Sequence, residues 1–130
     1  MFENLDVLRM AGGLASNAAA RQTAISRNVA NANTPGYKAL DVPGFAATYR
    51  QSDGFAPRAT LPGHFTGGVA DADTVPKPRL KPGTEAPDGN TVTLETELVA
   101  GAEAKQQHDM AIAIYRSSTN LLRLSLGVAK

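Results

Sequence analysis

The sequence predicts a mainly α-helical protein in which a long helix at each end of the chain flanks an irregular middle. All eight prolines lie between Pro35 and Pro87, so neither end contains a residue that breaks a helix. Residues 41–90 hold seven glycines and seven prolines and show no helical period. We divide the chain into an N-terminal helix (1–34), a middle segment (35–90) and a C-terminal helix (91–130), which together form one assembly domain.

Composition excludes several classes of protein. The 130 residues include no cysteine, so a disulfide scaffold is excluded. A net charge of +1 with 19% charged residues excludes a disordered polyelectrolyte and gives no support to nucleic-acid binding through bulk positive charge. Aromatic residues make up 5% and tryptophan is absent, so a compact core would be thin. The N-terminal residues lack a basic region, and we expect no cleaved secretory signal.

The first helix is expected over about residues 2–33, with one face made mostly of small residues. Spacings of three and four place on that face Leu8, Ala11, Ala15, Ala18, Gln22, Ile25, Val29 and Ala32. Small side chains let another helix approach closely but bury little area. The pair Gly12 and Gly13 lowers helix propensity by about 1–2 kcal/mol, which favours a kink or fraying at this point.

The last helix is expected over about residues 94–128, with Thr93 as N-cap and Glu95 and Glu97 near the positive end of the helix dipole. It has two apolar faces. One holds Leu94, Leu98, Ile112, Tyr115, Leu122 and Leu126, and the other holds Val99, Met110, Ile114, Leu121, Leu124 and Val128. A helix that is apolar on two sides needs two partners. We expect the first helix to cover one face, in a coiled-coil-like pair, and other copies of the chain to cover the second.

The middle segment contains two candidates for short β-strands, residues 45–49 and 65–69. A loop of this length inside a small protein is usually functional or disordered. Asp88-Gly89-Asn90 is a turn signal directly before the last helix.

The most informative stretch is the end of the first helix, residues 25–38. Pro35 cannot continue the helix, and Gly36 can adopt a positive φ at no steric cost. Asn31 and Asn33 can bond the free carbonyls of the last turn, and Tyr37 can anchor the departing chain. Physically, this is a helix stop followed by a turn.

The amino-acid sequence of this stretch resembles the signature motif of bacterial flagellar rod and hook proteins. It reads Asn28-Val29-Ala30-Asn31, one further residue, and Asn33-Thr34-Pro35-Gly36-Tyr37-Lys38. The segment from Asp88-Gly89-Asn90 through Leu98, together with the short length, resembles the proximal-rod members of that family. The resemblance covers residues 1–42 and 88–130. It departs at Asn33, where aspartate is common, and at Pro43-Gly44.

The resemblance implies a structural subunit of the basal-body proximal rod, without catalysis or cofactor. Such subunits polymerise through their terminal helices into a hollow drive shaft that crosses the periplasm, transmits torque and lets exported subunits pass. They leave the cytosol through the flagellar type III apparatus without a cleaved signal. The expected partners are copies of the chain, other rod subunits, and membrane-ring and export-gate proteins at the rod base, with no nucleic acid or small-molecule substrate.

The expected site residues form two groups. The helix-exit turn comprises Asn28, Asn31, Asn33, Thr34, Pro35, Gly36 and Tyr37. The assembly faces comprise Leu8, Ile25, Val29, Leu98, Ile112, Ile114, Tyr115, Leu121, Leu122, Leu124 and Leu126.

Other functions have weaker support in the sequence. The best-supported alternative is another short rod subunit of the same family. A membrane-interacting amphipathic helix protein and a small enzyme have less support in the sequence. His64 and His108 lack the convergent spacing of metal ligands, and Asp71 and Asp73 lack the glycine and terminal glutamate of a calcium loop. The basic run at 77–81 is expected to be a solvated loop.

Overall fold

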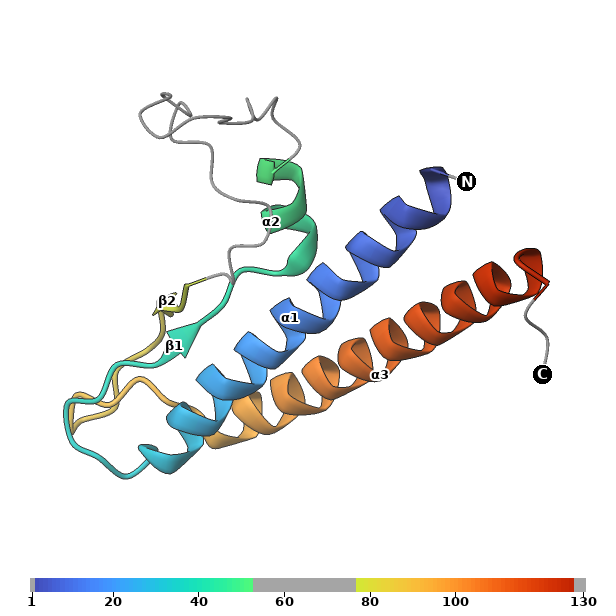
Figure 1. Cartoon of the computed structure of the whole chain (residues 1–130). Helices are drawn as coiled ribbons and strands as arrows, with labels where there is room; N and C mark the ends of the chain where they lie inside the picture. Colours follow the sequence, from blue (N-terminus) through green and yellow to red (C-terminus); the bar gives the residue numbers. More distant parts are fainter. Residues whose placement is uncertain (1, 53–76, 128–130) are drawn as a thin grey trace, which may run out of the picture.

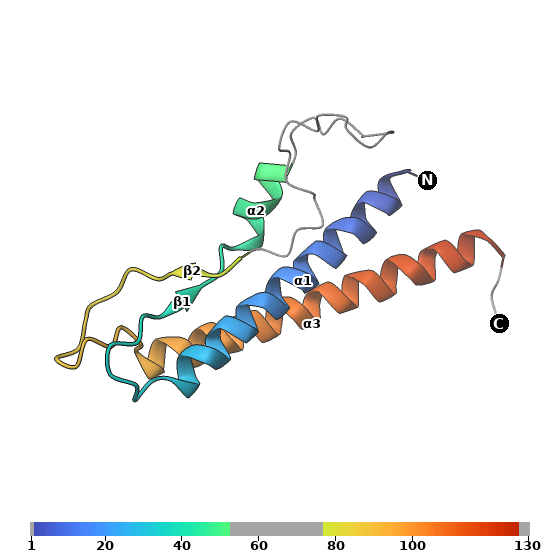
Figure 2. The ribbon, with the colours of Figure 1, turned by 60° about the vertical axis from the view of Figure 1, so that its left-hand side comes forward.

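The computed structural model describes residues 2–52 and 77–127. Its elements are α1 (Phe2–Ala30), β1 (Leu40–Asp41), α2 (Phe45–Ser52), β2 (Arg79–Leu80) and α3 (Leu94–Ser125). The long helices α1 and α3 run antiparallel and pack against each other (Figure 1). This confirms the predicted fold class. The helices are closest near the connecting segments and diverge toward the two chain ends (Figures 1 and 2).

Small residues make the contact between α1 and α3. The buried apolar side chains of the long helices are Ala11, Ala18, Ala24, Ala104 and Ala111. In α3 the buried positions Glu97, Ala104 and Ala111 follow each other at intervals of seven residues. Gly101 also faces α1, because a Cβ added there would lie 3.7 Å from Cγ2 of Ile25. The helices therefore approach closely and bury little area per residue.

The expectation that α1 covers one apolar face of α3 is met only in part, because Ile112 and Leu122 of the first face are half-buried. Leu94, Leu98, Tyr115 and Leu126 of one face are exposed, and so are Val99, Met110, Ile114, Leu121 and Leu124 of the other. The fully buried positions of α3 are instead Glu97, Ala104 and Ala111. Both sets of bulky side chains remain available for other contacts.

Residues 45–49, expected as a strand, instead begin α2 (Phe45–Ser52). The carbonyl of Gly44 accepts the first backbone hydrogen bonds, from the N–H groups of Ala47 and Thr48. Phe45 and Tyr49 lie one helical turn apart, with ring centroids separated by 5.3 Å. This aromatic pair and the alanines between its members favour a helix. The other candidate strand, 65–69, lies outside the described residues.

The start of α2 is fastened to α1 at two points. Asn17 of α1 is buried and donates a hydrogen bond from Nδ2 to the carbonyl of Pro43 at 3.0 Å. The ring of Phe45 lies over Gly13, where an added Cβ would stand 3.1 Å from Cε2. The glycine pair therefore does not interrupt α1, which runs unbroken from Phe2 to Ala30; Gly13 gives room for an aromatic ring.

Strands β1 and β2 form a two-stranded antiparallel sheet beside α1 (Figure 2). Leu40 pairs with Leu80 and Asp41 with Arg79. The N–H of Lys81 donates to the carbonyl of Ala39 at 2.8 Å. This short sheet brings the segment after α1 alongside the segment before α3.

Candidate functional site: a polar clasp at the end of α1

Two glycines in the left-handed region shape the exit turn of α1. Gly36 has a φ of +72° and Gly89 a φ of +78°. The N–H of Gly36 donates to the carbonyl of Asp88 at 2.9 Å. A Cβ at Gly89 would stand 3.5 Å from Cα of Gly36, so the two turns lie in contact. This confirms the expected positive φ at Gly36 and the turn at residues 88–90.

Asn90, far from α1 in the sequence, satisfies the carbonyls at the end of that helix. Its Nδ2 lies 3.1, 2.9 and 3.0 Å from the carbonyl oxygens of Asn31, Ala32 and Thr34. Its Oδ1 accepts the N–H of Val92 at 2.8 Å. These three carbonyls belong to the turn directly after Ala30, and the segment just before α3 supplies their donor.

Asn31 and Asn33, which the sequence predicts to bond the free carbonyls at the helix end, make fewer such bonds than Asn90. Asn31 donates from Nδ2 to the carbonyl of Arg27 at 2.8 Å, so it satisfies one carbonyl of α1 as expected. Asn33 is exposed to solvent, and so are Thr34, Pro35 and Gly36. The exposed part of the motif shapes the turn, whereas its buried member, Asn28, makes the long-range bonds described next.

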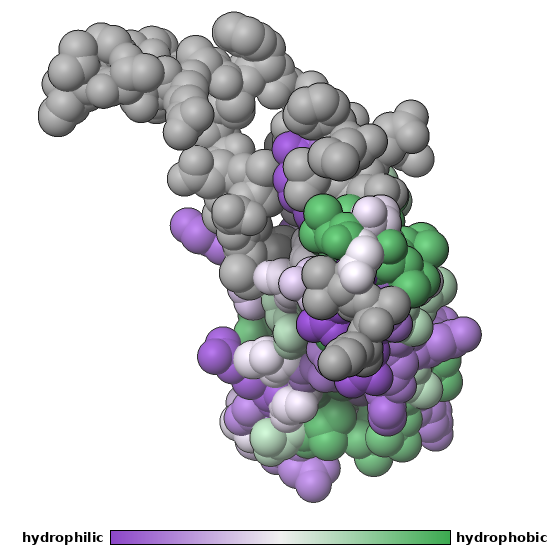
Figure 3. Space-filling model, turned by 45° about the vertical axis from the view of Figure 1, so that its right-hand side comes forward, coloured by the Kyte–Doolittle hydropathy of each residue, from purple (hydrophilic) through white to green (hydrophobic). Residues whose placement is uncertain are grey.

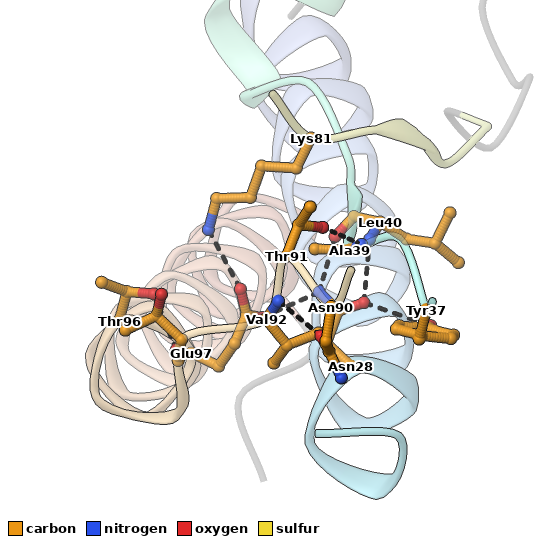
Figure 4. A network of polar contacts seen from close by, with 11 residues as sticks. Asn28, Tyr37, Ala39, Leu40, Lys81, Asn90, Thr91, Val92, Thr96 and Glu97 are labelled. Atoms are coloured by element: carbon orange, nitrogen blue, oxygen red, sulfur yellow. Dashed lines mark hydrogen bonds and ion pairs between the residues drawn. The ribbon is translucent and has the colours of Figure 1, made fainter. Parts of the chain in front are cut away.

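Asn28 is completely buried and uses its amide fully (Figure 4). Its Oδ1 accepts the N–H of Leu40 at 2.8 Å and the hydroxyl of Tyr37 at 3.3 Å. Its Nδ2 donates to the carbonyl of Leu40 at 2.7 Å and to Oε2 of Glu97 at 2.9 Å. An asparagine amide offers two donors and two acceptor sites, and all four are occupied. One side chain thus joins α1, β1 and α3.

Glu97 carries a charge into this network. It is 2% exposed, and its Oε1 accepts a hydrogen bond from Nζ of Lys81 at 3.0 Å (Figure 4). A buried carboxylate is stable only when it is paired and hydrogen-bonded. Both of its oxygens have partners here, one neutral and one cationic. Thr93, the expected N-cap of α3, has the extended backbone of that position but makes no capping hydrogen bond with its side chain.

Backbone bonds complete the connection. The N–H of Thr91 donates to the carbonyl of Tyr37 at 3.1 Å, and Oγ1 of Thr91 accepts the N–H of Ala39 at 2.8 Å. At the surface, Nζ of Lys38 pairs with Glu85 and donates to the carbonyl of Gly89. We call this set the clasp, defined by Asn28, Gly36, Tyr37, Leu40, Lys81, Asn90 and Glu97. It holds residues 28–40 and 81–97 together as one unit.

The clasp includes the signature at the end of the first helix, and the comparisons with known proteins agree with that reading. Residues 8–38 match the sequence model of a family described as flagella basal body rod protein. The chain is similar to that family over this segment. The matched segment is α1 from Leu8 onward with the exit turn up to Lys38. A search of curated proteins finds no match.

The family that this segment resembles is one of structural proteins of the flagellar basal body. Within the family match lie the buried Asn28 and the turn glycine Gly36. Outside it lie Lys81, Asn90 and Glu97, which supply the other half of the clasp. The matched segment is therefore completed by residues that are distant in the sequence.

Sequence reasoning assigned Lys81 to a solvated basic loop, Asn90 to a turn and Glu97 to the helix dipole, and it did not predict their contacts with the end of α1. One signal could have found Glu97, because it precedes Ala104 and Ala111 by seven and fourteen residues and so shares their stripe. A charged residue in a stripe of alanines indicates a buried partner.

The predicted assembly residues are spread along both long helices. Val29, Leu98, Ile114, Tyr115, Leu121, Leu124 and Leu126 are exposed, while Leu8, Ile25, Ile112 and Leu122 are half-buried. The view onto the end of the molecule where the helices diverge has separate hydrophobic areas between polar side chains (Figure 3).

The histidines and aspartates considered as metal ligands are either surface residues or lie outside the described residues. His64, Asp71 and Asp73 lie outside the described residues. Among residues 2–52 and 77–127, no three acidic or histidine side chains are grouped so that they could hold a metal ion. The carboxylate of Asp109 accepts a hydrogen bond from Lys105, which lowers its pKa, and lies 3.8 Å from Nδ1 of His108. Neither long helix, as far as it is described, has a stretch apolar enough to cross a membrane.

Proposed function

We propose that this chain is a subunit of the proximal rod, which polymerises through its terminal helices into a hollow shaft. The shaft transmits torque across the periplasm and lets exported subunits pass. The chain reaches it through the flagellar export apparatus without a cleaved signal. Its partners are copies of itself, other rod subunits, and ring and export-gate proteins at the rod base.

The observation that carries this proposal is the clasp, because it joins the family's N-terminal segment to residues 81–97. Asp88, Gly89, Asn90 and Glu97, which resemble the proximal members, are the residues that complete the family motif. The clasp fixes the two terminal helices to each other at one end. The large apolar side chains of α3 then face outward, as a subunit of a helical tube requires.

The motif at the clasp also favours a single assembly domain made of all three segments. Turn residues from the middle segment, Lys38 and Glu85, are paired across the same junction. A subunit that is loaded in torsion needs its two helices to move as one body, and bonds between distant segments provide this.

Imaging of intact basal bodies tests the position. A version of the chain carrying a small density label in residues 53–76 is expected at the membrane-proximal end of the rod. A label at the distal end would identify the chain as another short rod subunit. A label absent from purified basal bodies would contradict the proposal altogether.

A further inference from the structure

A second row of residues follows α3 on the side opposite α1. At 3.6 residues per turn, the positions half a turn away from Glu97, Ala104 and Ala111 form an outer seam. Its members are Val99, Ala102, Gln106, Met110, Ala113 and Ser117, all exposed. Val99 is 62% exposed and Met110 50%. None of these six residues is charged, although the exposed Asp109 lies beside Met110 on the same side of α3. The six repeat at spacings of three and four, as a helix-packing face does.

The free side of α1 has the complementary character. Its outer seam comprises Gly12, Ser16, Ala19, Thr23, Ser26 and Ala30, which are exposed except for the half-buried Ser16. This seam is also uncharged, and its side chains are short. A Cβ added at Gly12 would meet nothing within 4 Å. It therefore offers holes of the kind that Val99 and Met110 could fill.

Five of the six positions of each seam come opposite each other when the helices run in opposite directions, and Ala102 and Ser26 are the exceptions. If Met110 lies opposite Ala19, then Gln106 lies opposite Thr23 and Val99 opposite Ala30. Val99 and Met110 then each meet an alanine, and Gln106 meets Thr23. Inside the chain, Arg21 pairs with Gln107 at almost the same offset, with 3.1 Å between Nη1 and Oε1. Two copies in this contact would therefore be level with each other along the helix axes.

Charges beside the seams agree with this alignment. Arg27 flanks the outer seam of α1 and Glu103 flanks that of α3; both are exposed, and neither has an ion pair among the described residues. In antiparallel packing, the flanks on which these two residues lie face each other. Opposite charges at the edge of a seam favour the correct partner and register.

We propose that the outer seam of α3 packs against the outer seam of α1 in a second copy of the chain, antiparallel and at the same height. This contact is heterologous, so it leaves an unused seam of each kind at the ends of a row. Repetition then closes a ring or continues as a helix. The proposal rests on the proposed function for its setting, and it adds which faces meet and in which register.

Cysteine cross-linking tests the contact, because the natural chain has no cysteine. Two copies with different tags are expressed together in flagellated cells, one carrying Ala19→Cys and the other Met110→Cys, and basal bodies are purified and oxidised. A mixed disulfide dimer is expected. The matched control replaces Met110→Cys by Lys105→Cys, an exposed position of α3 away from the seam, and should give no mixed dimer.

The outcomes separate this inference from the proposed function. Basal bodies that contain both tagged chains but no more mixed dimer than the control would overturn the seam contact and leave the function intact. A link from Ala19→Cys to a different rod protein would overturn it as well. Absence of both chains from basal bodies would remove the proposed function and the seam contact together.

A charge exchange provides the second readout. With the cysteine pair in place, Arg27→Glu in the first copy should reduce the mixed dimer, and Glu103→Arg in the second copy should restore it. An unchanged yield in all three combinations would contradict the proposed register.

Discussion

The side chain of Asn28 and the backbone of Leu40 exchange two hydrogen bonds, with Oδ1 accepting at 2.8 Å and Nδ2 donating at 2.7 Å. The asparagine amide thus pairs with β1 much as a neighbouring strand would. A side chain of α1 therefore satisfies the backbone N–H and carbonyl of Leu40 at one edge of β1. Its remaining donor and acceptor reach Glu97 and Tyr37, so one buried side chain holds three elements.

Replacing Asn28 by alanine should therefore be strongly destabilising. The change leaves both backbone groups of Leu40 and one oxygen of Glu97 without this partner. Since an unsatisfied buried polar group costs about 1–3 kcal/mol, the free energy of unfolding should fall by about 3 kcal/mol or more. Urea titration followed by circular dichroism measures it. Asn33→Ala, an exposed neighbour, is the control and should behave like the natural chain; equal midpoints for the two variants would show that the Asn28 network is unimportant.

The ion pair between Lys81 and Glu97 gives a non-additive prediction. Lys81→Met leaves the buried carboxylate with only Asn28 as partner and should cost about 2 kcal/mol, which allows for the partly exposed side chain of Lys81. Adding Glu97→Gln removes the buried charge while an amide oxygen can still accept from Asn28. The double variant should therefore be more stable than Lys81→Met alone, as urea midpoints can measure. A double variant that is less stable would mean that the charge itself is needed.

Asn90→Ala should loosen the end of α1 although the substitution lies 56 residues or more away in sequence. The carbonyl of Ala32 would lose its donor, while those of Asn31 and Thr34 would keep only the N–H groups of Thr34 and Tyr37, at a cost of about 1–2 kcal/mol. Hydrogen exchange should rise in residues 31–40 and stay unchanged in the central part of α3. Thr93→Ala is the matched control: its side chain makes no cap bond, so the melting temperature should hardly move. Unchanged exchange in Asn90→Ala would refute the capping role.

The comparison between sequence and structure separates local signals from distant ones. The two long helices follow from the distribution of proline, and the positive φ of Gly36 follows from its place in the turn; both predictions are confirmed. The strand expected at residues 45–49 is wrong because apolar and aromatic residues suit either structure, and contact with Gly13 favours the helix.

The clasp partners depend on tertiary contacts that a single sequence does not reveal. Asn90 and Glu97 read as a turn residue and a helix-dipole residue when they are considered locally, and both are buried. For a related reason, the sequence indicates the bulky apolar faces of α3 but not that its fully buried positions are Glu97, Ala104 and Ala111. Large apolar residues mark a face that needs covering, but they do not say whether the same chain or another copy covers it.

Leu126→Asp should separate folding from assembly. Leu126 is 71% exposed, so the isolated chain should keep its stability within about 0.5 kcal/mol. If the residue is covered in the rod, the new carboxylate would be buried without a partner there, which is strongly unfavourable. Thermal unfolding of the purified chain and motility of cells that carry the variant measure the two effects. Motility at the natural level would exclude Leu126 from the assembly faces.

The neighbouring glycines of α1 should respond differently to alanine. At Gly12 an added Cβ meets open space, and alanine has the higher helix propensity, so Gly12→Ala should stabilise the isolated chain by about 0.5–1 kcal/mol. At Gly13 the same methyl group would press on the Phe45 ring at 3.1 Å, so Gly13→Ala should gain less or become destabilising. Thermal unfolding of both variants measures the difference. Adding Phe45→Ala to each isolates the cause, because the difference between the two glycine variants should then disappear. A difference that persists without the ring would show that contact with α2 is not what distinguishes the two positions.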